Sequence, residues 1–261
     1  MIYNNYTSYL KYDNLLMSFK SNPTYRSILE HVSLQHGEKY LDLILKEFPD
    51  ISKQKIIEFC QLNDSIGSPI KYSINNPNLN IECSPTSLRY VYHSLLILKH
   101  IKDTKCKNIV EVGCGYGGLC LAINYFMKDY SIIINNYNLI DLSEPCNLIK
   151  EYLNLHQNNI YTKNEIHDSS TYGSNIDCND LFFISNYCYT EIEKEYNINY
   201  TNILLPKVNN GFIIWQNGGN NGGYPITNCD DIIRKKTKLV IEEKPQTDAG
   251  YDIFKNYFVY F

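Results

Sequence analysis

The sequence predicts an α/β fold: a seven-stranded, mostly parallel sheet with an antiparallel last strand, preceded by a helical N-terminal extension. After Lys107, short apolar runs alternate with amphipathic ones, which is typical of a parallel sheet flanked by helices. The last two apolar runs are separated by Pro, Gly and Asp without a helical pattern, so we expect them to pair antiparallel. A chain of 261 residues buries roughly 75% of its unfolded surface, which is enough for one large core.

The N-terminal part has helical patterning. Apolar side chains follow an amphipathic spacing between residues 27 and 48. Ser84 and Pro85 provide an N-cap and a first helical residue, which predicts a second long helix. Between them, Asn63–Pro69 is rich in turn-forming residues. We therefore expect a helical region over residues 1–104, serving as a cap, a substrate-binding element or an oligomerisation surface, and a Rossmann-like domain over residues 105–261.

The elements of the second part follow from the apolar runs and the amphipathic segments between them. We expect strands at Asn108–Val112, Ile132–Ile140, Asn159–Tyr161, Leu181–Ser185, Phe212–Trp215, Leu239–Glu242 and Tyr257–Tyr260. We expect helices at Gly117–Met127, Glu144–Leu155, Glu191–Leu205 and Thr227–Lys236. Seven strands with a helix-free final connection argue against an ordinary dinucleotide-binding sheet.

Composition excludes several classes of function. With 24 basic and 28 acidic side chains the net charge is -4, so a nucleic-acid partner is not expected. The absence of a signal-peptide pattern and of an apolar run of about 20 residues predicts a cytoplasmic protein without a membrane partner. The nine cysteines contain no C-x-x-C pair, which argues against a structural zinc site.

The strongest local signal is a glycine-rich segment that follows the first strand of the sheet. Gly113, Gly115 and Gly117 lack a β-carbon, so the turn can take unusual dihedral angles and a ligand can approach the backbone. Their spacing, G-x-G-x-G-G, differs from the G-x-G-x-x-G of phosphate-binding loops. This spacing favours a ligand without phosphate groups. Two alternatives stay open: the segment binds a nucleotide such as NAD, or it is only a tight turn between strand and helix and binds no ligand.

Two acidic residues favour S-adenosylmethionine as that ligand. Glu111 stands two positions before the first glycine, and Asp141 ends the second strand, where a carboxylate can accept both ribose hydroxyls. S-adenosylmethionine carries a cationic sulfonium, an ammonium and a ribose, which suit two flanking acids. The candidate cofactor-binding residues are Glu111, Gly113, Cys114, Gly115, Tyr116, Gly117, Asp141, Leu142 and Ser185.

The run E-V-G-C-G-Y-G-G, with I-D-L after it, resembles class I S-adenosylmethionine-dependent methyltransferases. The segments Asn63–Pro69, Ser84–Tyr90 and Asp180–Glu191 are similar to the sugar O-methyltransferase family found among polysaccharide biosynthesis genes. The resemblance extends from roughly residue 60 to the C-terminus. It implies a Rossmann-like class I methyltransferase fold and methyl transfer to a hydroxyl of a nucleotide-linked or glycan sugar. Tyr189-Thr190-Glu191 departs from the family, which usually has Ser two positions after an aromatic residue.

The reaction is expected at the carboxyl ends of the strands, where ligands bind in open α/β sheets. Asn186 and Tyr187 follow the fourth strand, and Glu191 comes one helical turn later. We expect Glu191 to be the general base, with Asn186 and Tyr187 orienting the acceptor. His167, in the loop expected after the third strand, is the rival base.

Other residues are candidates for binding the acceptor or a metal. The acceptor-binding candidates are Asp64, Arg89, Tyr90, Asn217 and Glu243. A requirement for magnesium stays open. Asp177, Asp180 and Glu191 have carboxylates that could bind the ion, but their spacing matches no known pattern of metal ligands. Two other functions stay open as well, namely methylation of a non-sugar molecule or protein and a non-catalytic S-adenosylmethionine-binding subunit. The N-terminal region is also a candidate surface for a homo-oligomer.

Overall fold

The computed structural model describes residues 8–10, 15–217, 224–246 and 255–261. These residues belong to two compact units. The helical unit comprises residues 1–100, 115–132 and 147–160, and the sheet unit comprises residues 101–114, 133–146 and 161–261. The two units are interleaved along the chain, since each consists of three segments. The single boundary that the sequence predicts between residues 104 and 105 stays a prediction.

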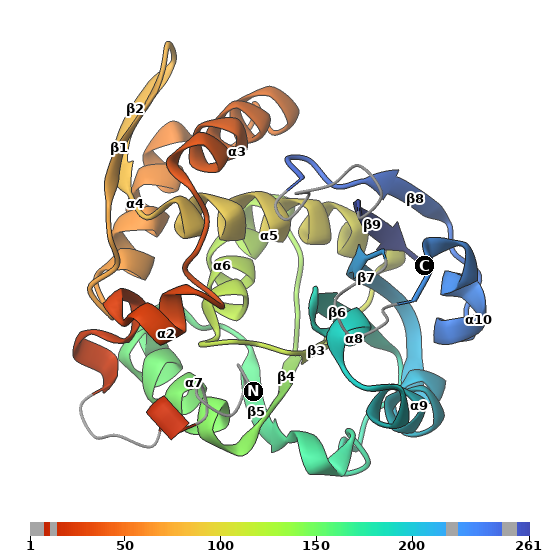
Figure 1. Ribbon diagram of the computed structural model, residues 1–261. Coiled ribbons are helices and arrows are strands. Elements are labelled where there is room, and N and C mark those ends of the chain that lie inside the picture. The colour runs from red at the N-terminus through yellow and green to blue at the C-terminus, as the bar shows by residue number, and fades with distance from the viewer. Residues whose placement is uncertain (1–7, 11–14, 218–223, 247–254) are drawn as a thin grey trace. The chain divides into compact units, whose positions relative to one another are not determined.

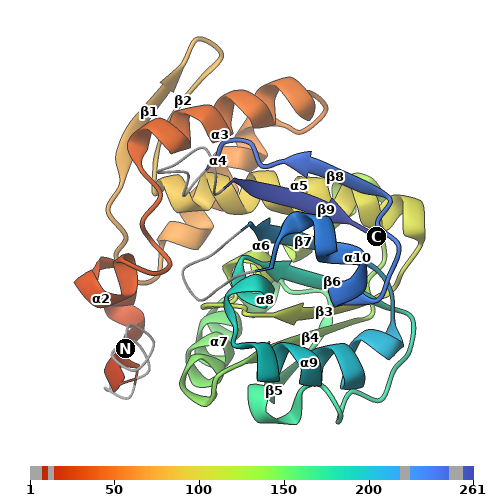
Figure 2. The same cartoon turned by 45° about the vertical axis from the view of Figure 1, so that its right-hand side comes forward.

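The sheet unit contains the seven-stranded sheet that the sequence predicts. Its strands, in chain order, are β3 (Asn108–Val112), β4 (Asn136–Asp141), β5 (Lys163–Asp168), β6 (Leu181–Asn186), β7 (Val208–Gln216), β8 (Leu239–Glu242) and β9 (Asn256–Tyr260). They are arranged in the order β5-β4-β3-β6-β7-β9-β8 (Figure 2). The strands β5, β4, β3, β6 and β7 are mutually parallel, and β9 is antiparallel to both β7 and β8. The predicted fold class is therefore confirmed.

The third strand was predicted in the wrong place. Asn159–Tyr161 forms no strand; the short 3-10 helix η4 covers Gln157–Asn159, and β5 begins at Lys163. The reason is exposure. As an edge strand β5 is buried completely at only one of its six positions, so it lacks the continuous apolar run that marks the central strands.

The helices of the sheet unit pack with a core dominated by large apolar side chains. They are α8 (Cys188–Glu191), α9 (Lys194–Ile203) and α10 (Cys229–Ile233), with the 3-10 helices η5 (Ser169–Thr171), η6 (Leu205–Lys207) and η7 (Ile226–Asn228). Phe183, Tyr189, Leu204 and Trp215 are buried members of this core. The helix predicted over residues 191–205 is α9, which starts only at Lys194 because the chain is extended at Ile192.

The helical unit contains most of the remaining helices (Figure 1). They are η1 (Leu15–Met17), η2 (Phe19–Ser21), α2 (Pro23–Arg26), α3 (Leu34–Glu47), α4 (Lys53–Asp64), α5 (Pro85–Thr104), α6 (Gly118–Phe126), η3 (Met127–Tyr130) and α7 (Ser143–Leu155). Residues 101–104 of α5 and 143–146 of α7 are counted with the sheet unit. The helix expected at Pro85 is confirmed. The amphipathic segment becomes helical only at Leu34, because the side chain of Ser33 caps α3 by accepting a hydrogen bond from the His36 amide.

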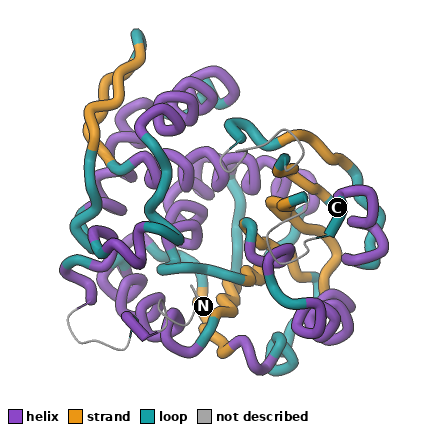
Figure 3. The backbone as a smooth tube through the Cα atoms, viewed as in Figure 1, coloured by secondary structure: helices purple, strands orange, loops and turns teal. Residues whose placement is uncertain are grey.

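A β-hairpin in the helical unit was not predicted. The strands β1 (Tyr72–Asn76) and β2 (Leu79–Cys83) pair antiparallel (Figure 3). Ile74 lies opposite Ile81, and both side chains are buried. β1 packs beside α3. Apart from Leu79 and Cys83, the other residues of the two strands are polar or exposed, so the only sequence signal is a short alternation around an Asn-Pro-Asn turn. In the described ranges, no helix combines the length and the apolar character needed to cross a bilayer.

Candidate functional site

The first feature of the site is the tight turn that follows β3 in the sheet unit. Gly113 has φ +81°, and its amide donates a hydrogen bond of 3.0 Å to the carbonyl of Ile140 at the end of β4. A β-carbon at this position would lie 2.3 Å from the Cβ atom of Cys188. Both the dihedral angle and the neighbouring side chain therefore require glycine at the first position of the motif.

Asp141 ties this turn to the end of β4. Its Oδ2 accepts a 2.7 Å hydrogen bond from the amide of Cys114, and its Oδ1 accepts a 2.8 Å bond from the amide of Leu142. The residue is half-buried at the carboxyl end of the strand. Leu142 follows it with 40% of its surface exposed. The structure thus brings three of the predicted cofactor-binding residues, Cys114, Asp141 and Leu142, into direct contact.

Glu111 lies beneath the same turn and is only 2% exposed. The hydroxyl of Tyr137 donates a 2.7 Å hydrogen bond to its Oε2. Burial raises the pKa of the Glu111 carboxyl to about 8; Tyr137 opposes this rise, and the charge of Asp141 adds to it. The group is therefore mainly protonated at neutral pH. Sequence reasoning did not find Tyr137, although the parallel pairing of β3 and β4 could have indicated it.

The rest of the glycine motif belongs to the helical unit. Gly115 and Gly117 have φ +60° and +88°, and Gly117 is the N-cap of α6. The side chain of Tyr116 is fully buried, shares hydrogen bonds with Asn63, and has the Lys20 ammonium 4.4 Å from its ring centroid. The aromatic ring of Tyr116 is therefore part of the core of this unit, and only its backbone remains a candidate for cofactor binding.

Ser185 fixes the start of the next loop. Its fully buried hydroxyl donates a 2.9 Å hydrogen bond to the carbonyl of Val112 and accepts a 3.0 Å bond from the amide of Tyr189. These bonds hold the end of β6 against the end of β3 and begin α8. The expected cofactor contact of this side chain is not supported by that geometry, because both bonds are made within the protein.

Tyr187 has an unusual backbone conformation, with φ +69° and ψ −39°. A bulky residue in such a conformation stores about 1–3 kcal/mol of strain, and strain of this kind is concentrated at functional sites. The Tyr187 hydroxyl donates a hydrogen bond to Oε1 of Glu243, which is 1% exposed. Oε2 of Glu243 accepts a 2.9 Å bond from the side chain of Asn256. Two residues predicted for separate roles are thus joined in one buried network.

Asn186 and Glu191 flank this strained residue. Asn186 ends β6 and Glu191 ends the one-turn helix α8, and both side chains are half-buried. The charge of Glu191 contributes, after burial and Asp141, to the raised pKa of the Cys188 thiol, which places the carboxylate near the turn that carries Gly113. Its assignment as general base stays a prediction.

His167 lies inside β5. The expectation that it lies in a loop after the third strand is therefore wrong. The ring is buried; Nε2 is 3.0 Å from Oδ1 of Asn138, and Nδ1 is 3.0 Å from the side-chain nitrogen of Asn175. Burial lowers the pKa of the imidazole. A neutral ring with both nitrogens bonded to amides is suited to holding β4 and β5 together and is a poor proton acceptor.

The acceptor-binding candidates of the helical unit are buried among its helices. Asp64 accepts hydrogen bonds from the Ser84 amide (2.7 Å) and the Ser87 hydroxyl (2.5 Å), and therefore holds the end of α4 against the start of α5. Arg89 donates a 3.0 Å bond to the carbonyl of Leu29. The ring of Tyr90 packs edge-on to that of Tyr116, with centroids 5.6 Å apart. These contacts give all three residues a packing role inside the unit.

The remaining candidates concern loops and metal binding. The side chain of Asn217 accepts a 2.9 Å hydrogen bond from the amide of Ile226. The sequence predicts that the Asn-Gly cluster at residues 217–223 is either a loop that closes over substrate or a passive connection, and residues 218–223 lie outside the described residues. The structure does not gather Asp177, Asp180 and Glu191 into a metal site. Over the described ranges, no group of three or more His, Cys, Asp and Glu side chains is arranged to hold a metal ion.

The comparison with solved structures identifies the fold. The N-terminal domain of EvdMO1, crystallised in the presence of SAH and D-fucose, matches 80% of this chain and 96% of its own with a TM-score of 0.50 and 8% identity. The methyltransferase domain of bacterial CtHen1-C covers 64% of this chain and 95% of its own (TM-score 0.49, 12% identity). A SAM-dependent methyltransferase from Aquifex aeolicus covers 62% and 87% (TM-score 0.45, 14% identity).

The fold of this chain is therefore the Rossmann-like methyltransferase fold. No protein-family model matches the sequence. No curated protein matches it either.

Proposed function

We propose that this protein is an S-adenosylmethionine-dependent O-methyltransferase that acts on a sugar hydroxyl, either nucleotide-linked or in a glycan, in polysaccharide biosynthesis. The observation that carries the proposal is the half-buried Asp141 carboxylate, which holds the Cys114 amide of the glycine turn at the carboxyl end of β4. The methyltransferase fold supports the same conclusion. The sugar acceptor rests on the resemblance carried by Asn63–Pro69, Ser84–Tyr90 and Asp180–Glu191.

The residues at the turn fit a nucleoside with a cationic tail. A carboxylate has about four acceptor positions, so Asp141 can hold two backbone amides and still accept ribose hydroxyls. The exposed side chain of Leu142 is beside it and offers an apolar surface for the base. S-adenosylmethionine supplies the electrophilic methyl group when it is bound. Glu111 provides a buried carboxyl that a nearby cation would help to ionise.

The protein's own part in the reaction is to position the acceptor and to remove its proton. The acceptor oxygen attacks the methyl carbon as the bond from that carbon to sulfur breaks and its electron pair returns to sulfur. Glu191 takes the hydroxyl proton, while Asn186 and Tyr187 orient the sugar. Positioning contributes roughly 7–11 kcal/mol and a general base typically 10²–10⁴-fold, so we expect placement to dominate.

The first experiment is calorimetric titration of the full chain with S-adenosylmethionine and, separately, with NAD. We expect binding of the methyl donor only, and a loss of about tenfold or more for Asp141→Asn, since a charged acceptor for the ribose is removed. Asp177→Asn, at an exposed position, is the matched control. Absence of donor binding, or equal binding of NAD, would overturn the assignment.

The acceptor is tested by mass spectrometry of nucleotide sugars incubated with the protein and S-adenosylmethionine. A gain of one methyl group on a sugar hydroxyl is the expected product. Glu191→Gln should keep donor affinity and lower kcat by about 10²-fold or more. Transfer to a non-sugar molecule alone, or an unchanged kcat in Glu191→Gln, would contradict the acceptor or the base, respectively.

A further inference from the structure

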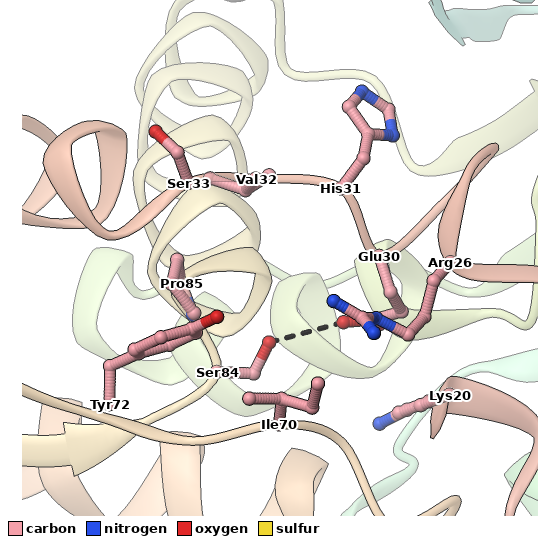
Figure 4. A pocket seen from close by; sticks show the side chains of 10 residues that line it. All are labelled: Lys20, Arg26, Glu30, His31, Val32, Ser33, Ile70, Tyr72, Ser84 and Pro85. Carbon is pink, nitrogen blue, oxygen red and sulfur yellow. Dashed lines mark hydrogen bonds between the residues drawn. The ribbon is translucent and has the colours of Figure 1, made fainter. Parts of the chain in front are cut away.

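The helical unit contains a cavity that none of the predicted site residues explains (Figure 4). Its volume is about 120 Å³, and it lies where the chain passes from α2 to α3, between β1 and the start of α5. Its lining includes the polar side chains of Lys20, Arg26, Glu30 and Ser84. A single water molecule needs only about 10–15 Å³ of such space, so the cavity is large enough for a small organic molecule.

Glu30 brings a buried carboxyl group to this cavity; burial raises the pKa of this group, and the charge of Lys20 opposes the rise. The side chain is 9% exposed, and its Oε2 accepts a 3.1 Å hydrogen bond from the hydroxyl of Ser84 (Figure 4). Oε1 is buried and has no hydrogen-bond partner among the described residues. A buried carboxyl oxygen without a hydrogen-bond partner costs about 1–3 kcal/mol, so this atom is suited to accept a hydrogen bond from a ligand.

Two cationic side chains line the same cavity. The guanidinium of Arg26 is half-buried and makes neither a hydrogen bond nor an ion pair within the described part of the chain. The Lys20 ammonium is almost completely buried, donates to the carbonyl of Asn63, and lies over the ring of Tyr116. Burial lowers the pKa of Lys20 to about 8, so it is still largely charged at neutral pH. The cavity therefore has an excess of positive charge.

We propose that this cavity binds a small hydroxylated anion, a phosphate monoester or a carboxylate that also carries a neighbouring hydroxyl group. The anionic end pairs with Arg26, whose planar guanidinium matches either oxyanion. The hydroxyl donates to Oε1 of Glu30. An ammonium ligand would be repelled by Arg26 and Lys20, and an anion without a hydroxyl would leave Glu30 without its donor.

This site is separate from the proposed methyl transfer. All of its lining residues belong to the helical unit, and binding requires no S-adenosylmethionine. Titrations of the protein in the absence of the methyl donor therefore test it alone, and a failure of donor binding would leave the result unaffected.

The experiment is calorimetric titration of the full chain with four compounds: glycerol 3-phosphate, glycerate, inorganic phosphate and glycerol. We expect at least one hydroxylated anion to bind about tenfold or more tightly than phosphate or glycerol alone, since each of these two lacks one of the paired contacts. Comparing glycerol 3-phosphate with glycerate tells which oxyanion the cavity takes. If neither binds, or if phosphate alone binds equally well, the proposal is overturned.

Two substitutions separate the two contacts. Arg26→Met should lower the affinity for the preferred anion about tenfold or more, whereas Arg26→Lys should retain part of it. Glu30→Gln should reduce the preference for the hydroxylated anion over phosphate, a ratio that a general loss of stability does not change. Lys39→Met and Glu38→Gln, both exposed on α3, are the matched controls. Unchanged binding in Arg26→Met, or an unchanged ratio in Glu30→Gln, contradicts the proposed contacts.

Discussion

At the scale of single residues, the most informative groups are polar side chains that the fold keeps away from water. Glu111 is such a group, because its ordinary partner in solution is water and its main partner in the protein is the Tyr137 hydroxyl. Because burial raises its pKa to about 8, ionisation of this carboxyl is unfavourable in the folded chain and favours unfolding. This carboxyl therefore lowers the stability of the protein as the pH rises from about 4.5 to 8.

Replacing Glu111 by Gln should remove that dependence. Below pH 4.5 both folded and unfolded chains hold the proton; between 4.5 and 8 only the folded chain holds it, so stability falls by at most about 1.4 kcal/mol per pH unit. We expect the stability of Glu111→Gln relative to the natural chain to increase from pH 5 to pH 8 in urea unfolding. Glu195→Gln, on the exposed side of α9, is the control. Parallel pH profiles of the natural chain and Glu111→Gln would contradict the account.

The network of Tyr187, Glu243 and Asn256 makes a second prediction at this scale. Tyr187→Phe removes one hydrogen-bond donor from the buried Glu243 carboxylate, which should cost about 1–3 kcal/mol of stability. Denaturant unfolding measures the loss, and Tyr196→Phe, at an exposed position, should change stability by less than about 0.5 kcal/mol. An equal effect of the two substitutions would mean that the buried hydroxyl contributes nothing.

At the scale of secondary-structure elements, termini carry much of the specificity of the fold. The helix α5 begins at Pro85, as its sequence predicts, and the predicted N-cap Ser84 accepts a 3.3 Å hydrogen bond from the Thr86 amide. Asp64, twenty residues earlier, in turn accepts hydrogen bonds from the Ser84 amide and the Ser87 hydroxyl. The same Asn63–Pro69 segment that resembles the sugar O-methyltransferase family thus has a structural task. A pattern shared within a family can reflect such a buried polar contact as readily as it reflects a ligand contact.

Asp64→Asn should therefore destabilise the protein. The asparagine side chain has one acceptor oxygen, whereas the Asp64 carboxylate has two. Either the Ser84 amide or the Ser87 hydroxyl therefore loses its acceptor. We expect a loss of about 1–3 kcal/mol in denaturant unfolding. Asp103→Asn, near the other end of α5 and exposed, is the control. No difference between the two variants would show that the two hydrogen bonds of Asp64 contribute nothing to stability.

At the scale of the whole molecule, the sequence predicts the strands that consist of continuous apolar runs. The central strands β3 and β6 and the antiparallel pairing of β8 with β9 follow from such runs. The edge strand β5 and the β1–β2 hairpin do not, because exposed positions interrupt their patterns.

The site was predictable to the extent that its residues are close in sequence. Cys114 and Asp141 were found from the ends of adjacent strands. The contact of Tyr187 with Glu243 joins residues 56 positions apart, and nothing in a single sequence indicates it. The Arg26 and Glu30 cavity lies in a stretch without a motif, so only the three-dimensional arrangement identifies it.

The interleaving of the two units has a consequence for how the chain is made. Asn63, fully buried in the helical unit, accepts a 2.7 Å hydrogen bond from Tyr152, a residue 89 positions later in the chain. A ribosome adding about 5–20 residues per second reaches that partner only about 4–18 s after it has placed Asn63. The helical unit therefore cannot complete its core while its first hundred residues emerge, and during that interval its aromatic side chains lack their final neighbours. The N-terminal half of this protein therefore has to wait several seconds during synthesis before its core can be completed.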